Sequence, residues 1–424
     1  MQPAKSLQAA SCADDYDPNS LPVDKARQLI RQFLVPVTGT ERVSLRAALG
    51  RVLGEDVISP LAVPAHDNSA MDGYAVRHTD LKPDGETALR VLGTAFAGAP
   101  FRGAVGPGEC VRIMTGAIVP AGADTVVMQE QVQSDGQTAR IGPGNYKAGQ
   151  NVRRAGEDLK PGQVVLVRGK QLRPAELGLL ASLGIGEVSV FRRLRVAFFS
   201  TGDELVSIGT PLGEGQIYDS NRYTIYGMLA RLGCEVIDMG VVRDDPAALE
   251  QAFQEATAMA DVVITSGGVS VGEADYTKDL LDKLGEVVFW KIAMKPGRPL
   301  AYGKVGGAHF FGLPGNPVSV MVTFYEFVRD ALLVLMGRSD VTPLPTFQVR
   351  CVTPLKKAPG RTEFQRGILS QEPSGEWVVR VTGDQGSGIL RSMAEANCFI
   401  VLPHDQGPLP AGSLVEVQLM EGLV

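Results

Sequence analysis

The sequence has few residues that form disulfides or bind transition metals. Its five cysteines are scattered singly, which excludes a disulfide framework and indicates reduced thiols: Cys12, Cys110, Cys234, Cys351 and Cys398. The four histidines show no ligand-like spacing, which argues against a zinc site. No run of about 18 apolar residues occurs, and the acidic N-terminus lacks the apolar segment of a signal peptide. We therefore expect a soluble, cytoplasmic protein.

The charge balance also excludes some partners. With 41 basic and 47 acidic residues, the net charge is −6, so no global basic field favours nucleic acid or an anionic membrane. Any anionic ligand must be bound by a local group of cations. At 424 residues the chain is long enough for two to four domains with their own cores.

Changes in periodicity along the chain predict several domains. An amphipathic helix begins near Pro22, glycine-punctuated short strands follow Leu61, and strands alternate with helices from Leu194. The expected parts are a disordered tail (1–20), a discontinuous N-terminal domain (21–60 plus 150–190), an inserted small β domain (61–149), an α/β domain (191–340) and a C-terminal β domain (341–424).

The segment 191–340 has the pattern of a doubly wound α/β domain. Its expected strands are 196–199, 235–239, 262–264, 287–290 and 310–312, and its expected helices are 223–232, 246–259, 274–284 and 317–336. Ligands of such domains bind at the carboxyl ends of the strands. The polar turns of this segment fall at those ends.

One of these turns has the composition of a phosphate site. A buried strand ends in Ser266, Gly267 and Gly268, where glycines allow backbone N–H groups to approach an anion. Ser270 and Asp275 follow, just where a helix is expected to begin. An ordinary strand-to-helix turn capped by Asp275 is the alternative interpretation.

Two other turns supply carboxylates. Glu204 follows the first strand, and Asp244 with Asp245 follows the second. Pro246 suits the first helical position, so Asp245 is expected to be the helix N-cap. Asp244 is not needed as a helix cap and is a candidate ligand-binding residue. An ordinary solvated carboxylate is the alternative interpretation.

The last two turns supply positive charge. Lys291, Lys295 and Arg298 lie within eight residues, in a loop stiffened by prolines, where a solvated face is the alternative to an oxyanion site. A fifth turn then starts a long helix and is a further candidate for ligand binding: Pro314, Gly315, Asn316 and Pro317.

Together the turns favour a phosphorylated ligand with Mg²⁺. A Walker P-loop and a dinucleotide Gly-x-Gly-x-x-Gly are both missing.

At this point the chain resembles a known family, the MoeA-type molybdopterin molybdenumtransferases, which include the E domain of gephyrin. The resemblance rests on eight motifs before residue 320 and two after it. The motifs are Asp67–Ala75, Arg112–Gly116, 149–158, Phe199–Leu205, Ile217–Asn221, Ser266–Tyr276, Lys295–Pro299, Leu313–Pro317, Phe364–Gly367 and Gln385–Ser387.

The resemblance implies a four-domain, elongated homodimer with a MogA/MoaB-like α/β domain and a cleft shared with the partner's β insert. The implied activity is the last step of molybdenum cofactor synthesis: molybdate is delivered to the dithiolene of adenylated molybdopterin, and AMP is released with Mg²⁺. The family's functional positions fall at Asp72, Thr115, Glu204, Asp244, Asp275, Lys291, Lys295, Arg366 and Ser387. Other proteins of the same biosynthetic route are further expected partners.

Roles for these positions follow from the resemblance. Asp244 and Asp275, with Glu204 as a further candidate, would hold Mg²⁺. Lys295, Arg298, Arg366 and Ser387 would bind molybdate, a tetrahedral dianion. Asp72 and Thr115 lie in the β insert and would complete the cleft across the dimer, although Met-Asp-Gly is also a good turn sequence.

Two other functions are compatible with the same motifs. A scaffold protein would bind a peptide partner, by analogy with the clustering role of gephyrin. An adenylyltransferase of the related Ser-Gly-Gly fold would make the adenylated pterin from ATP instead of consuming it.

Overall fold

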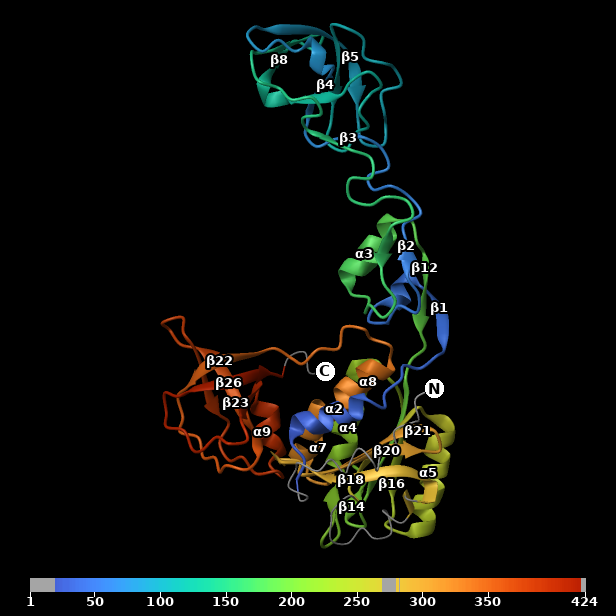
Figure 1. Ribbon diagram of the computed structural model, residues 1–424, viewed down its shortest axis with the longest axis vertical. Helices are drawn as coiled ribbons and strands as arrows, with labels where there is room; N and C mark the ends of the chain where they lie inside the picture. Colours follow the sequence, from blue (N-terminus) through green and yellow to red (C-terminus); the bar gives the residue numbers. More distant parts are fainter. Residues whose placement is uncertain (1–19, 269–279, 282, 421–424) are drawn as a thin grey trace.

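The protein is long and divided, with a small sheet at one end, a narrow neck, and two packed bodies at the other end (Figure 1). The computed structural model describes residues 20–268, 280–281 and 283–420. The predicted N-terminal tail therefore lies almost wholly outside the described residues. Among the helices that are described, none is long and apolar enough to cross a membrane.

The α/β body is built on a six-stranded mixed sheet in the order β16-β13-β17-β21-β20-β18. Its strands are β13 (Arg195–Thr201), β16 (Glu235–Val242), β17 (Val262–Ser266), β18 (Gly285–Lys291), β20 (Pro299–Val305) and β21 (Ala308–Leu313). The first four in spatial order are parallel, and β20 and β18 add an antiparallel edge. The predicted doubly wound α/β fold is confirmed, although the sequence did not predict β20.

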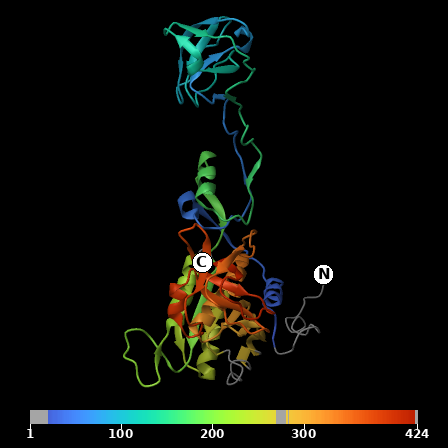
Figure 2. The same cartoon turned by 90° about the vertical axis from the view of Figure 1, so that its left-hand side faces the viewer.

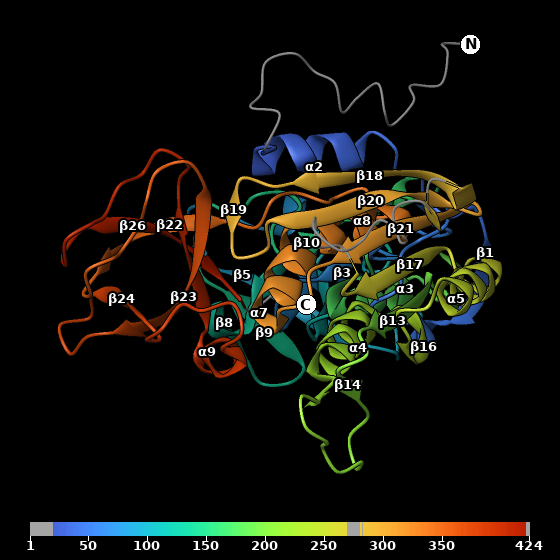
Figure 3. The ribbon, with the colours of Figure 1, turned by 90° about the horizontal axis from the view of Figure 1, so that it is seen from below.

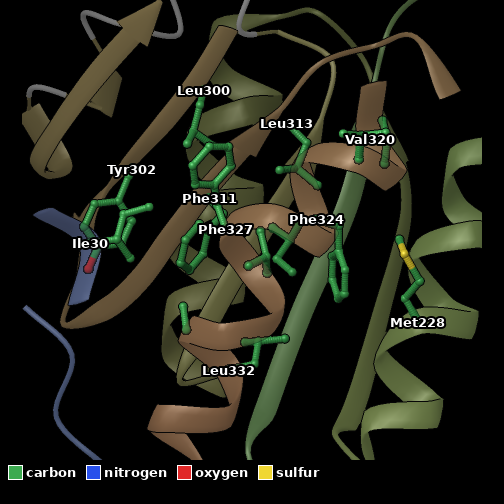
Figure 4. Close-up of a cluster of buried hydrophobic side chains, with 14 of the residues drawn as sticks. Ile30, Met228, Leu300, Tyr302, Phe311, Leu313, Val320, Phe324, Phe327 and Leu332 are labelled. Carbon is green, nitrogen blue, oxygen red and sulfur yellow. The ribbon is translucent and has the colours of Figure 1, made fainter. Parts of the chain in front are cut away.

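Helices cover both faces of this sheet because successive strand residues point to opposite sides. On one face Val196, Phe198 and Ile264 join the core under α4 (Ser220–Leu232) and the helical run α7 (Pro317–Thr323), η4 (Phe324–Val328) and α8 (Arg329–Leu335). Figure 4 shows part of this core, where Phe311, Phe324 and Phe327 lie together. On the other face Ala197, Phe199 and Val263 pack with α5 (Pro246–Met259).

Short polar signals set the ends of these helices. Asp245 caps α5 by accepting from the Ala248 amide at 3.0 Å, and Pro246 follows at the first helical position, as predicted. Gly233, in the left-handed conformation with φ of 83°, ends α4. Asn316 occupies the N-cap position of α7, but its side chain makes no capping hydrogen bond.

The first described helix, α2 (Val23–Arg31), packs on the α/β body. Its apolar side chains Val23, Ala26 and Ile30 belong to the same buried core as β13 and α8. Arg27 forms an ion pair with the buried Glu326 of η4. The expectation that this helix shares a domain with residues 150–190 is therefore corrected, because its apolar face packs on the α/β body beside η4. Figure 3 shows α2 lying along that body.

The narrow part of the molecule consists of chain segments that leave the α/β body and return to it. Its paired strands are β1 (Thr40–Ser44) with β12 (Glu187–Phe191), β2 (Val57–Ile58) with β11 (Val164–Leu166), and β3 (Asn68–Ser69) with β10 (Val152–Arg153). Beside them α3 (Pro174–Ser182) helps to cover a small core that contains Leu53 and Leu180. Near the far end, Asp67 accepts hydrogen bonds from Arg154 at 2.6 Å and from the Ala155 amide at 2.8 Å.

The β insert and the C-terminal body are both sheet structures. In the insert, the sheet order is β7-β4-β6-β5-β9-β8, and the strands are β4 (Gly73–Val76), β5 (Thr87–Ala95), β6 (Glu109–Ile113), β7 (Thr125–Met128), β8 (Val132–Ser134) and β9 (Thr138–Ile141). The C-terminal strands are β22 (Thr346–Cys351), β23 (Thr362–Gln371), β24 (Trp377–Val381), β25 (Cys398–Leu402) and β26 (Leu414–Leu419), with α9 (Leu390–Glu395) beside them. The β23–β25 pairing closes these five strands into a barrel.

Two short elements connect the bodies or extend from them. β19 (Met294–Lys295) leaves the α/β body and pairs in parallel with β23 of the barrel. β14 (Leu205–Val206) and β15 (Ile217–Tyr218) form the base of a loop that projects from the α/β body (Figure 2).

The aromatic contacts of α5 allow a test of the core on its face of the sheet. Phe253 is 1% exposed, and its ring lies 5.2 Å from that of Phe199 and 5.5 Å from that of Phe310. We expect Phe253→Ala to lower the free energy of unfolding of the α/β body by about 3–5 kcal/mol, because it leaves a cavity between those rings. Urea unfolding followed by Trp290 fluorescence, in a Trp377→Phe background, measures the change. Met259→Ala, at an exposed position of the same helix, is the control and should have little effect; a Phe253→Ala loss below about 1 kcal/mol would contradict the packing argument.

Candidate active site

A cavity of about 940 Å³ lies at the carboxyl ends of the parallel strands. β13 ends at Thr201, β17 at Ser266 and β21 at Leu313, so the turns that follow these strands meet at one edge of the sheet. The cavity is lined by Thr201, Gly202, Glu204, Leu205, Ile217, Tyr218, Asp219, Ser220, Asn221, Asp244, Leu249, Ser266, Gly267, Gly268, Pro299, Pro314, Gly315, Asn316, Pro317, Gly388 and Leu390.

Most of the predicted turn residues lie in this cavity wall. The cavity brings together two predicted carboxylates, the Ser-Gly-Gly turn after β17 and the turn after β21. These residues are Glu204, Asp244, Ser266, Gly267, Gly268, Pro314, Gly315, Asn316 and Pro317. Ser270 and Asp275 lie outside the described residues, so the metal-ligand role of Asp275 stays a prediction.

The Ser-Gly-Gly turn depends on glycine for two reasons. Gly267 has φ of 91°, and a side chain there would place its Cβ 2.5 Å from the carbonyl oxygen of Thr201. The Gly267 amide donates to the Leu313 carbonyl at 3.1 Å, which holds two neighbouring turns together. That amide is therefore engaged within the protein, which differs from its expected role of facing an anion.

The C-terminal barrel reaches the cavity through one loop. The Ser387 carbonyl accepts from the Val318 amide at 3.1 Å, in the first turn of α7, and Gly388 lines the cavity. Arg366, on β23, is 1% exposed and donates to the Gly386 carbonyl and to Ser392 Oγ, both at 3.0 Å. Burial lowers the pKa of Arg366 to about 10. In this structure Arg366 thus braces the loop that carries Ser387.

The predicted cations lie beside the cavity and do not line it. Lys295 is about half exposed, with its ammonium 3.6 Å from the buried carboxylate of Glu363. Lys291 ends β18, and its carbonyl accepts from the Leu21 amide at 2.7 Å. Arg298 is exposed and precedes the lining residue Pro299.

Two predicted residues are far from this cavity within one chain. Asp72 and Thr115 lie in the β insert, at the opposite end of the molecule from β14 and α4 (Figure 1). They contact each other: Asp72 accepts from both the amide and the hydroxyl of Thr115 at 2.7 Å. The Thr115 hydroxyl, followed by its amide, holds the pKa of Asp72 below its usual range.

The structure adds functional candidates that the sequence analysis did not assign. Asp219 caps α4 by accepting from the Arg222 amide at 3.1 Å, and Asn221 donates to Ser266 Oγ at 2.8 Å and to the Gly315 carbonyl at 2.6 Å. Both residues line the cavity. An Asp-Ser-Asn sequence before a helix is a capping signal, so the sequence contained a local clue to Asp219 but none to the contacts of Asn221.

Negative charge concentrates on one side of the cavity. Partial burial, followed by the nearby carboxylates of Asp203 and Glu204, raises the pKa of Asp244. Oδ2 of Asp219 is buried there and has no hydrogen-bond partner among the residues that the structure describes. In the described part of the chain, no group of three His, Cys, Asp or Glu side chains is arranged to hold a metal ion.

Three family models match consecutive parts of the chain. They are the MoeA N-terminal region (domain I and II) over residues 21–184, a probable molybdopterin binding domain over 197–333, and the MoeA C-terminal region (domain IV) over 348–420.

Individual relatives agree with the family models over nearly the whole length. The chain is 49% identical to a molybdopterin molybdenumtransferase of Haemophilus influenzae, covering 94% of this chain and 98% of the relative. It is 33% identical to gephyrin of Dictyostelium discoideum, covering 95% of this chain and 62% of that protein. A crystal structure of a molybdopterin biosynthesis MoeA protein from Pyrococcus horikoshii is similar with a TM-score of 0.82 and 30% identity, covering 95% of this chain and all of the other.

The neighbouring carboxylates of Glu204 and Asp244 predict a change in the pKa of Asp244 that NMR can measure. Glu204→Gln removes one negative neighbour of Asp244, so the pKa of Asp244 should fall toward its ordinary value. Because the folded-state pKa of Asp244 is raised, its contribution to stability is present at low pH and is lost as pH rises through that pKa; the variant should reduce this loss. Carboxyl ¹³C titration of Asp244 tests the shift, with Glu255→Gln on α5 as the control. An unchanged pKa in Glu204→Gln would show that the two carboxylates do not interact.

Proposed function

This chain belongs to the MoeA family of molybdopterin molybdenumtransferases, and we propose that its cavity binds adenylated molybdopterin during molybdenum insertion. The protein is a transferase of molybdenum cofactor biosynthesis. In the proposed reaction, molybdate is delivered to the dithiolene sulfurs of the pterin, and the phosphoanhydride is cleaved to release AMP. The observation that carries the proposal is the meeting of the Ser266–Gly268 and Pro314–Pro317 turns with two carboxylates in one cavity.

The proposal assigns the phosphates to the cavity and molybdate to the cations that lie beside it. The start of the helical run from Pro317, together with the Ser266 hydroxyl, suits the phosphoanhydride oxygens. Lys295, Arg298 and the loop braced by Arg366 lie on the barrel side and suit molybdate, which needs cationic and hydroxyl donors. Lys291, the last residue of β18, precedes these cations in the chain.

The acidic side of the cavity offers carboxylate oxygens, the ligands that Mg²⁺ prefers, and a complete site would need Asp275 in addition to the described residues. Asp244 and Glu204 line the cavity, and burial followed by like charges raises the pKa of Asp244. Within the described part of the chain, Asp219 Oδ2 is buried without a hydrogen-bond partner. A cation bound there would offset this repulsion, with Asp275 as the further predicted ligand. When bound, Mg²⁺ would supply charge stabilisation to the leaving phosphate. Asp244 and Glu204 would hold the ion, and their own negative charge disfavours an anion beside them when no cation is bound.

Two adjacent aspartates give a matched test of this assignment. With adenylated molybdopterin, molybdate and Mg²⁺ supplied, the enzyme should release AMP, and Asp244→Asn should slow that release by about 100-fold or more, since it removes charge at the metal site. Asp245→Asn should retain near-normal release, because asparagine also caps helices and Asp245 caps α5. AMP is quantified by chromatography. Equal activity of the two variants would contradict the role of Asp244, and no molybdate-dependent AMP from the wild type would contradict the function.

The thiols support a cytoplasmic location. Cys110, Cys234, Cys351 and Cys398 are free and buried, and burial raises the pKa of Cys110, Cys234 and Cys398 to about 12. Such thiols are unreactive and form no framework that an oxidising compartment would be needed to maintain.

We also propose that the chain works as a homodimer. The α4 face and the projecting loop expose several large apolar side chains beside the cavity: Ile208 (60% exposed), Ile217 (54%), Tyr223 (47%) and Tyr226 (51%). A second copy of the chain would cover such a surface. The separation of Asp72 and Thr115 from the cavity within one chain supports an arrangement in which the partner's insert completes the cleft.

Subunit mixing tests whether the site is shared. Asp72→Ala and Asp244→Asn should each be inactive alone, whereas an equal mixture after subunit exchange should recover about a quarter of wild-type activity, because half the dimers carry one intact site of two. AMP release measures recovery, and sedimentation confirms the dimer. No recovery in a mixture shown to contain heterodimers would contradict a site shared between the two subunits.

A further inference from the structure

Asn221 is a buried side chain that connects two turns of the cavity wall. It is 8% exposed, lies in the first turn of α4, and donates to Ser266 Oγ and to the Gly315 carbonyl. Ser266 ends β17, and Gly315 follows β21, so one amide contacts both turns.

The contact with Gly315 fixes the orientation of the Asn221 amide. A backbone carbonyl can only accept, and it lies 2.6 Å from Nδ2, so the nitrogen must face Gly315. The second N–H of the same nitrogen then points to Ser266 Oγ at 2.8 Å. The reverse orientation would place two oxygens against each other in a buried site.

This orientation determines what the Ser266 hydroxyl can do. Because Oγ accepts from Asn221, its own proton must be donated elsewhere, and no acceptor for it is found among residues 20–268, 280–281 and 283–420. Ser266 is 1% exposed and lines the cavity. The neighbouring Gly267 amide already donates to the Leu313 carbonyl, so it does not replace the Ser266 hydroxyl as a donor to the cavity.

We propose that Asn221 is a positioning and specificity residue that holds the Ser266 hydroxyl as a hydrogen-bond donor to a phosphate oxygen of the ligand. The inference rests on the proposed function for the identity of that phosphate, which belongs to the adenylated substrate and then to AMP. An aspartate of the same shape would reverse the polarity: its carboxylate would accept the Ser266 proton and face the Gly315 carbonyl. The amide at position 221 therefore selects for an anionic ligand.

Calorimetric titration with AMP and adenosine tests the proposal on the full-length protein. The wild type should bind AMP more tightly than adenosine. Asn221→Asp and Ser266→Ala should each weaken AMP binding by about 10-fold or more, the usual effect of losing a hydrogen bond to a charged group, with adenosine binding changed by less than about 2-fold. Because both changes act through one hydroxyl, the double variant should bind AMP no more weakly than the weaker of the two single variants.

Two further variants separate polarity from charge and from misfolding. Ser220→Asp adds the same charge at the adjacent, cavity-lining position without contacting Ser266, and should have a clearly smaller effect than Asn221→Asp. Ser266→Cys keeps the side chain nearly the same size and leaves the Asn221–Gly315 contact in place, and should weaken AMP binding if the hydroxyl is the donor. It serves as the test if Asn221→Asp fails to fold.

Several results would overturn the proposal: a wild type that does not prefer AMP to adenosine, additive effects of Asn221→Asp and Ser266→Ala, an equal loss in Ser220→Asp, or wild-type AMP affinity in Ser266→Cys. Failure of the proposed function would look different. A protein that discriminates AMP from adenosine through Ser266, but releases no AMP when molybdate is supplied, would retain this inference and lose the molybdenum-insertion step.

Discussion

The site depends on the parallel pairing of β13, β17 and β21. Parallel strands end at the same edge of a sheet, so strand pairing alone brings together the turns after Thr201, Ser266 and Leu313. The cores on both faces hold the strands in register through alternating residues such as Phe198 and Phe199. The cavity is therefore a consequence of the sheet, and the residues in the turns decide its chemistry.

Opposite charges are kept on different sides of that cavity. Carboxylates follow β13 and β16, whereas Lys295 and Arg298 follow β18 near the barrel. Two cations near the site already have partners: Lys295 lies beside Glu363, and Arg366 donates to Gly386 and Ser392. Such contacts reduce the conformational freedom that a ligand would otherwise have to remove on binding, which is the physical meaning of preorganisation.

Much of the α/β body could be predicted from the sequence, and the reasons are local. Apolar runs marked β13, β17 and β21, and Asp245-Pro246 marked the start of α5. β20 was missed because Pro299 and Gly303 interrupt its strand pattern. The partner of α2 was misplaced because an amphipathic helix shows that it packs, but not against which body. Likewise, the charge of Arg366 was visible in the sequence, but its burial depends on the closed barrel, a long-range property.

The neck has a consequence for how this architecture can vary. The chain enters and leaves the β insert through neighbouring segments, joined by the Val63–Leu159 bridge and by the contacts of Asp67 with Arg154 and Ala155. These contacts join the two segments to each other, and the insert beyond them has buried clusters of its own. The insert is thus a separable module: it can be exchanged, shortened or grafted onto another host at one pair of closely spaced junctions, while the sheet that carries the cavity keeps its own core.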